Sequence, residues 1–119
     1  MKFPEDAGVT LEKREQLKSR LARLAIRLEA IEEQAIRGSG PGGQKINKTS
    51  SGVRLSYDLM GEQIQVKWVR ERSRSLNRFL ALRELVDEVE ERISPETSAR
   101  VQERERIRRQ KDRRRRRRE

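Results

Sequence analysis

Apolar residues recur at helical spacing in the first quarter of the chain. The residues that share this face are Leu17, Leu21, Leu24 and Leu28. Their spacings of four, three and four residues predict one face of a helix that begins near Leu11, with Thr10 as its cap. Residues 1–9 show no periodicity and are expected to form a frayed arm. We expect the leucine face to dock on the rest of the fold; the mixed charges of the other face leave a protein-binding role open.

An alternation of period two follows in the middle of the chain. Its two apolar runs are Val53, Leu55 and Tyr57, then Ile64, Val66 and Trp68. Such alternation predicts half-buried strands, and the segment Met60-Gly61-Glu62 between them predicts a hairpin. A further short strand is expected at residues 32–36, although its apolar content is thin.

Helical periodicity returns over residues 75–93. The residues of its broad apolar face are Leu76, Phe79, Leu80, Leu82, Val86, Val89 and Ile93. Pro95 is expected to stop this helix. The pattern therefore predicts an α+β fold, in which helices cover a small mixed or antiparallel sheet that contains a hairpin.

Composition limits the size of this fold and indicates a partner. The chain has 119 residues, of which 32% are hydrophobic and 42% charged, so one small domain with a modest core is expected, as a monomer. A net charge of +10 indicates a polyanionic partner. With only 3% aromatic residues, binding that depends on base stacking is disfavoured, and the RNA backbone is the expected target.

The chain has neither cysteine nor histidine. Thiolate nucleophiles, disulfides and histidine-based triads are thereby excluded, and neither a metal nor a cofactor is expected. There is no apolar run of membrane-spanning length, so no membrane partner is expected. The acidic start of the chain does not resemble a targeting segment, and a cytoplasmic location, in bacteria rather than in an organelle, is predicted.

Basic residues dominate the chain after Pro95. Twelve basic and five acidic residues give this tail seven of the ten net positive charges. Such a segment has no core and is expected to be disordered or a fluctuating helix until phosphates neutralise it. The tail residues expected to bind RNA are Arg108, Arg109, Lys111, Arg113, Arg114, Arg115, Arg116, Arg117 and Arg118.

A glycine-rich segment interrupts the strands at residues 38–43. Such segments are usually linkers, but this one is followed at once by Gln-Lys-Ile-Asn-Lys-Thr and a strand pattern. Its match to a dinucleotide fingerprint lacks the helix that should follow, and a phosphate-binding P-loop fails because Gln44 stands where lysine is required. The residues instead indicate a stiffened loop that presents Gln44 at its tip.

This loop carries a family resemblance. Gly40-Pro41-Gly42-Gly43-Gln44-x-x-Asn47-Lys48-Thr49, followed by Val53-Arg54-Leu55, resembles the catalytic domain of class-I peptide chain release factors and their rescue-factor relatives. Similar segments stand at residues 31–37 and 71–78, so the resemblance covers about residues 28 to 93, with the basic tail as a looser similarity.

The resemblance implies a reaction that the ribosome completes. In release factors the loop enters the peptidyl-transferase centre, where water attacks the ester of peptidyl-tRNA. Gly42 and Gly43 would let the backbone thread between nucleotides, and the backbone N–H of Gln44 would stabilise the developing oxyanion. The Gln44 side chain would position water and exclude larger nucleophiles. Ribosomal RNA and the tRNA 2′-hydroxyl would move the protons, and a dedicated methyltransferase would methylate the Gln44 amide.

Residues around the loop receive supporting roles. Gly40, Pro41, Asn47 and Thr49 are expected to hold its shape, and Lys45, Lys48 and Arg54 to meet RNA phosphates. Each of these three cations, taken alone, fits an ordinary solvated position equally well. Many family members have histidine where this chain has Lys45, so a contact through that imidazole is not expected here.

The length of the chain indicates the subclass. We expect an N-terminal arm and helix (1–27), a catalytic domain (28–94) and an RNA-binding tail (95–119), without room for a codon-reading domain. This architecture resembles a stand-alone ribosome-rescue peptidyl-tRNA hydrolase that binds large-subunit RNA, with its tail in the empty mRNA channel of the small subunit. Similarity around Glu33, Gln34 and Asn77 leaves open a hydrolase that acts on separated large subunits with a helper protein. A non-catalytic RNA-binding or ribosome-assembly protein is the other alternative.

Overall fold

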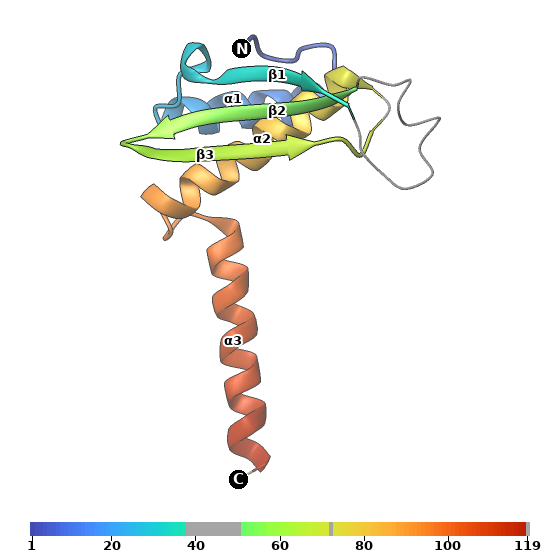
Figure 1. Ribbon diagram of the computed structural model, residues 1–119. Helices are drawn as coiled ribbons and strands as arrows, with labels where there is room; N and C mark the ends of the chain where they lie inside the picture. Colours follow the sequence, from blue (N-terminus) through green and yellow to red (C-terminus); the bar gives the residue numbers. More distant parts are fainter. Residues whose placement is uncertain (38–50, 72, 119) are drawn as a thin grey trace. The chain divides into compact units, whose positions relative to one another are not determined.

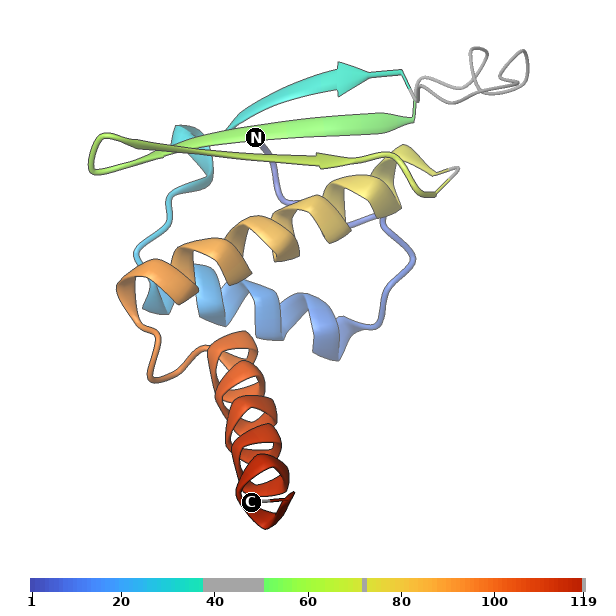
Figure 2. The same ribbon diagram turned by 60° about the horizontal axis from the view of Figure 1, so that its bottom comes forward.

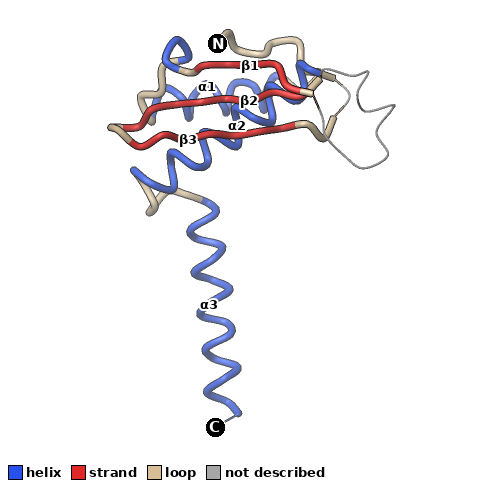
Figure 3. The backbone as a smooth tube through the Cα atoms, viewed as in Figure 1, coloured by secondary structure: helices blue, strands red, loops and turns tan. Residues whose placement is uncertain are grey.

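A computed structural model describes residues 1–37, 51–71 and 73–118. They form two compact units, Met1–Val86 and Asp87–Glu119. In chain order the elements are α1 (Leu11–Arg23), the 3₁₀ helix η1 (Leu28–Ala30), β1 (Glu32–Ile36), β2 (Gly52–Leu59), β3 (Glu62–Trp68), α2 (Arg74–Ile93) and α3 (Ala99–Arg118). The predicted α+β class is confirmed, because the described residues combine helices with an antiparallel sheet (Figures 1 and 3).

The sheet has three antiparallel strands in the order β1-β2-β3. The predicted hairpin is present, and its turn places Met60 at φ 52° and Gly61 at φ 92°. Two successive positive φ angles are typical of a type I′ turn, whose twist matches that of the strands it joins. The Asp58 carboxylate accepts a 3.0 Å hydrogen bond from the Gly61 N–H and holds the turn. The chain therefore reverses directly, and β2 and β3 pair from Leu59↔Glu62 to Val53↔Trp68.

Both α1 and the first part of α2 lie on one face of the sheet (Figures 1 and 2). The buried side chains of the first unit come from all of these elements: Leu17 and Leu21 of α1, Val53, Leu55, Ile64 and Val66 of the strands, and Phe79, Ala81, Leu82, Leu85 and Val86 of α2. Apolar strand positions alternate toward this face, as the period-two pattern predicted. In α2 the buried stripe differs from the predicted one. Ala81 and Leu85, which were not predicted, are buried, whereas Leu76 and Leu80 are half-buried and Ile93 is 44% exposed.

The first helix is shorter than its leucine spacing predicted. Thr10 caps it as expected, with its hydroxyl accepting from the Lys13 N–H. The helix ends at Arg23 because Ala25 turns to φ 57°, and Ile26 N–H then bonds to the Leu21 carbonyl at 2.9 Å. These are features of the Schellman motif, which closes a helix. The prediction that Leu28 belongs to the helix face is therefore wrong; Leu28 begins η1.

The predicted frayed arm is also wrong, because residues 1–9 pack on the first unit. The Phe3 ring meets Phe79 edge to face, with centroids 6.3 Å apart, and Pro4 is fully buried. The Arg78 guanidinium donates to the Lys2 carbonyl at 2.8 Å, and the Ser75 hydroxyl donates to Asp6 at 3.0 Å. Each partner lies about 70 residues away in sequence. The arm is held by contacts that local periodicity does not register.

The second unit contains the end of α2 and all of α3. Ser98 precedes α3, and its hydroxyl accepts from the Val101 N–H at 3.4 Å. The hydroxyl of Thr97 donates to the Glu90 carboxylate at 2.7 Å, which ties the connection between the helices to α2. Within the basic tail, Ala99–Arg118 form a 20-residue helix.

Candidate functional site

The predicted catalytic loop lies outside the described residues. This applies to Gly40, Pro41, Gly42, Gly43, Gln44, Lys45, Asn47, Lys48 and Thr49. The structure does describe the two strand ends from which the loop departs and to which it returns. They determine where the loop is anchored.

Both anchors lie on neighbouring strands. Ile36, the last residue of β1, is the register partner of Gly52, the first residue of β2. A Cβ atom added to Gly52 would lie 2.5 Å from Val69 Cγ1 and 2.7 Å from the Ile36 carbonyl oxygen. Only glycine fits here, because real Cβ atoms do not come so close to a backbone oxygen. The close approach brings the beginning and the end of the loop to one point on the sheet.

Asn77 of α2 holds the segment that follows the loop by hydrogen bonds. Its side chain is fully buried, and its amide donates to the Ser51 carbonyl at 2.7 Å and to the Glu71 carbonyl at 2.8 Å. Its oxygen accepts from the Glu71 N–H at 3.0 Å. The Ser51 hydroxyl also donates to the Glu71 carbonyl, at 3.1 Å. One buried amide thus joins the exit of the loop to the segment between β3 and α2.

Sequence reasoning placed Asn77 in a family-like segment but did not assign it this role. A signal was present: Asn77 begins a row of residues four apart, with Ala81 and Leu85, and all three are fully buried. A polar residue in an apolar row must find partners inside the protein, because burying an unpaired amide is costly. Which partners it finds depends on the tertiary structure.

An ion pair links the same helix to β1. Arg78 Nε lies 2.8 Å from Glu33 Oε2, and both side chains are half-buried. Because Arg78 also donates to the arm, it connects the strand, the helix and the N-terminal residues. The ion pair therefore holds β1, the strand that leads into the loop, against α2.

Arg54, predicted to bind RNA, lies on β2 between Gln34 of β1 and Lys67 of β3. Direct partners on antiparallel strands share a face, so these three side chains form a row. Arg54 Nη1 donates to the Gln34 amide oxygen at 3.4 Å. This row faces away from the buried residues Val53 and Leu55.

The tail cations fall into two groups within the second unit. Arg100 pairs with Asp87 at 3.6 Å and with Glu91 at 3.8 Å, and Arg104 also pairs with Glu91. The hydrogen bond from Arg104 lowers the pKa of Glu91, and the positive charges of Arg104 and Arg100 add to the effect. The predicted RNA-binding residues come later and are all exposed: Arg108, Arg109, Lys111, Arg113, Arg114, Arg115, Arg116, Arg117 and Arg118.

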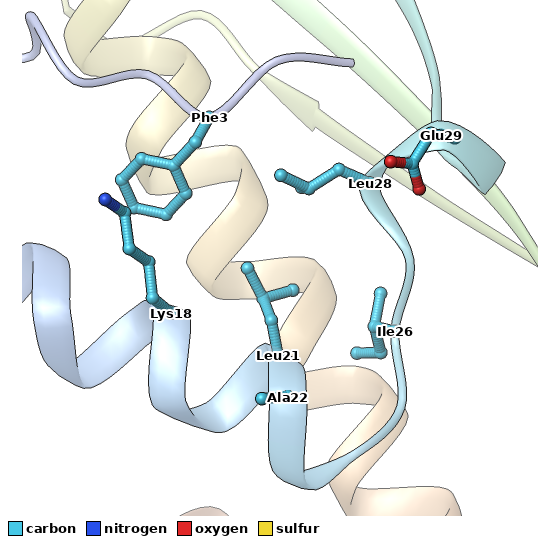
Figure 4. A pocket seen from close by; sticks show the side chains of 7 residues that line it. All are labelled: Phe3, Lys18, Leu21, Ala22, Ile26, Leu28 and Glu29. Atoms are coloured by element: carbon cyan, nitrogen blue, oxygen red, sulfur yellow. The ribbon is translucent and has the colours of Figure 1, made fainter.

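A surface pocket of about 330 Å³ lies in the first unit (Figure 4). It is lined by Phe3, Lys18, Leu21, Ala22, Ile26, Leu28 and Glu29. Its lining is mainly apolar, and Lys18 is paired with Glu5 at 2.6 Å. The lining residues include no nucleophile with an adjacent base, so the pocket does not compete with the loop as a site of chemistry.

Other kinds of site are not found in the part of the chain that the structure describes. No group of three or more potential metal-binding side chains occurs among residues 1–37, 51–71 and 73–118. Within the same ranges, no helix combines the length and the apolar character that crossing a bilayer demands.

Comparison with known proteins agrees with this architecture. Residues 15–119 match the family described as RF-1 domain. A peptide chain release factor homolog from Escherichia coli is 47% identical over 53 residues, which cover 44% of this chain and 25% of the relative. The mitochondrial translation release factor in rescue from Danio rerio is 52% identical over 60 residues, covering 50% and 36%. Its human counterpart is 42% identical over 69 residues, covering 58% and 40%.

This chain spans between a quarter and two fifths of the length of these relatives. The family match, in contrast, extends over most of the chain and includes both anchors, Asn77 and the whole of α3. The chain therefore belongs to the RF-1 domain family, the family of the class-I release factor catalytic domain.

Proposed function

We propose that this protein hydrolyses the ester of peptidyl-tRNA in the peptidyl-transferase centre of stalled ribosomes, without reading a codon. The observation that carries the proposal is that the Gly-Gly-Gln sequence falls, along the chain, between two strand ends that pair with each other. Pairing of Ile36 with Gly52 and the hydrogen bonds of Asn77 support presentation of the loop at a defined place. Membership of the RF-1 domain family supports the same reaction class.

In this proposal the protein supplies positioning and one electrostatic contact. The backbone N–H of Gln44 stabilises the oxyanion that forms when water attacks the ester carbon, and its side chain positions that water. Gly42 and Gly43 allow the loop backbone to pass between nucleotides. The leaving tRNA ribose oxygen takes a proton relayed through its 2′-hydroxyl and ribosomal RNA. A glutamine amide does not titrate near neutral pH, so the protein itself needs no acid or base.

The loop requires support and a matching RNA surface. We assign Gly40, Pro41, Asn47 and Thr49 to the shape of the loop, and Lys45, Lys48 and Arg54 to RNA phosphates. We also propose that a dedicated methyltransferase methylates the Gln44 amide.

In this proposal the arginines of α3 bind ribosomal RNA and supply the affinity that codon recognition gives to decoding release factors. Residues 113–118 are six consecutive arginines, which gain most where phosphates neutralise them. We assign these residues, with Arg108, Arg109 and Lys111, to the mRNA channel left empty on a ribosome stalled on truncated mRNA.

The test is release of labelled peptide from three substrates: ribosomes on truncated mRNA, ribosomes paused at a stop codon, and isolated large subunits carrying peptidyl-tRNA. Fast release from the first substrate and slow release from ribosomes paused at the stop codon is the expected result. Release only from isolated subunits would assign the protein to rescue after subunit splitting. No release from any substrate, even with Gln44 methylated, would overturn the proposal in favour of a non-catalytic RNA-binding protein.

Two variants make the test specific. Gln44→Ala should lower the release rate at least about 100-fold, as loss of a group that positions the reacting atoms does. Gln63→Ala is the matched control, because Gln63 is an exposed amide on β3 at the hairpin end. Equal loss in both variants, or none in Gln44→Ala, would contradict the role of Gln44.

The tail is tested with a truncation that the structure defines. Ending the chain after Ile107 removes the nine tail residues predicted to bind RNA but keeps the ion pairs of Arg100 and Arg104 with α2. Release from truncated-mRNA complexes should then require higher protein concentration and show a weaker salt dependence. An unchanged salt dependence would exclude the tail from RNA binding.

A further inference from the structure

The sheet has one face that no helix of the first unit covers. Within residues 1–86, α1 and α2 both lie on the opposite face (Figures 1 and 2). The strand register places two polar rows on the open face: Gln34, Arg54 and Lys67, then Glu32, Ser56 and Gln65. Tyr57 and Trp68 have the register of the buried residues, so the two rows offer amides, a hydroxyl, two cations and the Glu32 carboxylate, but no aromatic ring.

Charge on this sheet changes along the strands. At the end where the loop departs lie Arg54 and Lys67, with Arg37 and Arg70 just beyond the strands. The hairpin half instead carries acidic residues, which are Glu32, Asp58 and Glu62. Even with Glu71 counted, the loop end is positive.

The cations at the loop end form no ion pair in the part of the chain that the structure describes. Among the described residues, no carboxylate lies within 4.0 Å of Arg37, Arg54, Lys67 or Arg70. Arg70 lies over the Trp68 ring at 4.9 Å, and Arg54 contacts the Gln34 amide. In contrast, the cations Arg14, Lys18, Arg27 and Arg78 of the same unit each pair with a carboxylate. Unpaired cations collected at one end are available to an external anion.

We propose that this open face, at its loop end, binds the backbone of the tRNA acceptor stem. Arg54 and Lys67 meet phosphates, while Ser56 and Gln65 meet ribose hydroxyls, because amides and hydroxyls both donate and accept. The lack of an aromatic ring on the face fits contact with a duplex backbone, whose bases are stacked inside.

The choice of RNA follows from reach, and it rests on the proposed function. From Arg37 to Gln44 the chain spans seven residues, which extend at most about 25 Å. The ester that Gln44 addresses is covalently joined to the acceptor end of the tRNA. The acceptor end of the tRNA must therefore lie within this distance of Arg37 whenever the reaction occurs, and the acceptor stem is the duplex that continues from it.

The test maps the RNA next to the sheet. Because the chain has no cysteine, Lys67→Cys provides a single attachment point for an iron chelate that generates hydroxyl radicals. Gln63→Cys is the matched control on the same strand, four residues away at the hairpin end. On ribosomes carrying peptidyl-tRNA, we expect acceptor-stem cleavage from position 67 to be several-fold stronger than from position 63. Equal cleavage from both positions, or cleavage of ribosomal RNA only, would overturn the proposal.

A second readout measures the contact without a label. Lys67→Glu should raise the protein concentration for half-maximal release on the order of tenfold and reduce the salt slope by about one or two, with the saturating rate unchanged. Gln63→Glu should change neither quantity. A fall in the saturating rate alone would assign Lys67 to the fold or the loop instead of the tRNA.

The mapping does not depend on hydrolysis, so the two proposals fail separately. If the protein releases peptide but the chelate at position 67 cleaves only ribosomal RNA, the proposed function stands and the acceptor-stem contact is refuted. If the chelate cleaves the acceptor stem but the protein does not release peptide, the contact stands and the proposed function is refuted.

Discussion

Replacement of Asn77 by alanine removes the contact that joins the loop exit to the rest of the fold. The side chain makes three hydrogen bonds to the backbone of Ser51 and Glu71, at 2.7, 2.8 and 3.0 Å. At a net contribution of about 1 kcal/mol each, their loss lowers the free energy of unfolding by about 3 kcal/mol. Asn77 is fully buried, so water does not readily replace the amide.

The assay is urea unfolding followed by circular dichroism, combined with hydrogen exchange of the Glu71 amide. Arg83→Ala is the control, because it removes an exposed side chain from the same helix and should change the stability by less than about 0.5 kcal/mol. The Glu71 amide should exchange faster in Asn77→Ala and not in the control. A loss below about 1 kcal/mol, or unchanged exchange at Glu71, would refute the reasoning.

Asn77→Asp separates hydrogen bonding from packing, since it keeps the shape and the acceptor oxygen. At neutral pH its carboxylate faces two carbonyl oxygens, so this variant should be at least as unstable as Asn77→Ala. On acidification the carboxyl group becomes a hydrogen-bond donor, so the difference in unfolding free energy between Asn77→Asp and the wild type should become smaller. If this difference in unfolding free energy does not depend on pH, the destabilisation comes from packing alone.

Ala25→Gly should raise the free energy of unfolding by about 0.5–1 kcal/mol in urea unfolding, because glycine adopts the φ of 57° without a Cβ penalty. Ala22→Gly, inside the helix, should lower it by a similar amount of about 0.5–1 kcal/mol, and equal signs for both would contradict the Schellman assignment. Gly52→Ala should lower the free energy of unfolding by about 1–3 kcal/mol. Adding Val69→Ala should restore only part of this loss, since the clash of the new Cβ with the Ile36 carbonyl oxygen remains; full restoration would contradict the importance of that oxygen. The pKa of Glu91 is lowered below 4.5 by its hydrogen bond to an α3 arginine, so its contribution to helix stability is present above 4.5 and lost as pH falls through the lowered value. The helical circular dichroism signal should therefore fall in acid, less so in Glu91→Gln, and identical acid profiles would refute the pairing.

Strand positions were predictable because alternation is a local property. Val53 and Leu55, with Ile64 and Val66 across the hairpin, are all buried, as their period-two spacing predicted. The turn at Gly61 was predictable for the same reason, since positive φ angles favour glycine at that point of the chain.

Helix boundaries were less predictable. Thr10 was identified as a cap from its type and position, whereas the end of α1 depends on Ala25 adopting a conformation that alanine seldom takes. Leu28 continued the spacing of the leucines although the helix had already ended. Spacing alone does not register a change in backbone direction between two positions.

The amino-acid sequence by itself determined the strands and the α+β class, and it predicted a polyanionic partner and the reaction class to test. Residue types, short spacings and net charge carry this information, and all of them are local or additive. Only the tertiary structure decided that the arm packs through Phe3 on Phe79, that Asn77 ties Ser51 to Glu71, and that the unpaired cations gather at the loop end of the sheet. These features join residues far apart in sequence, and their partners are chosen by how the chain folds back on itself, which no local pattern specifies.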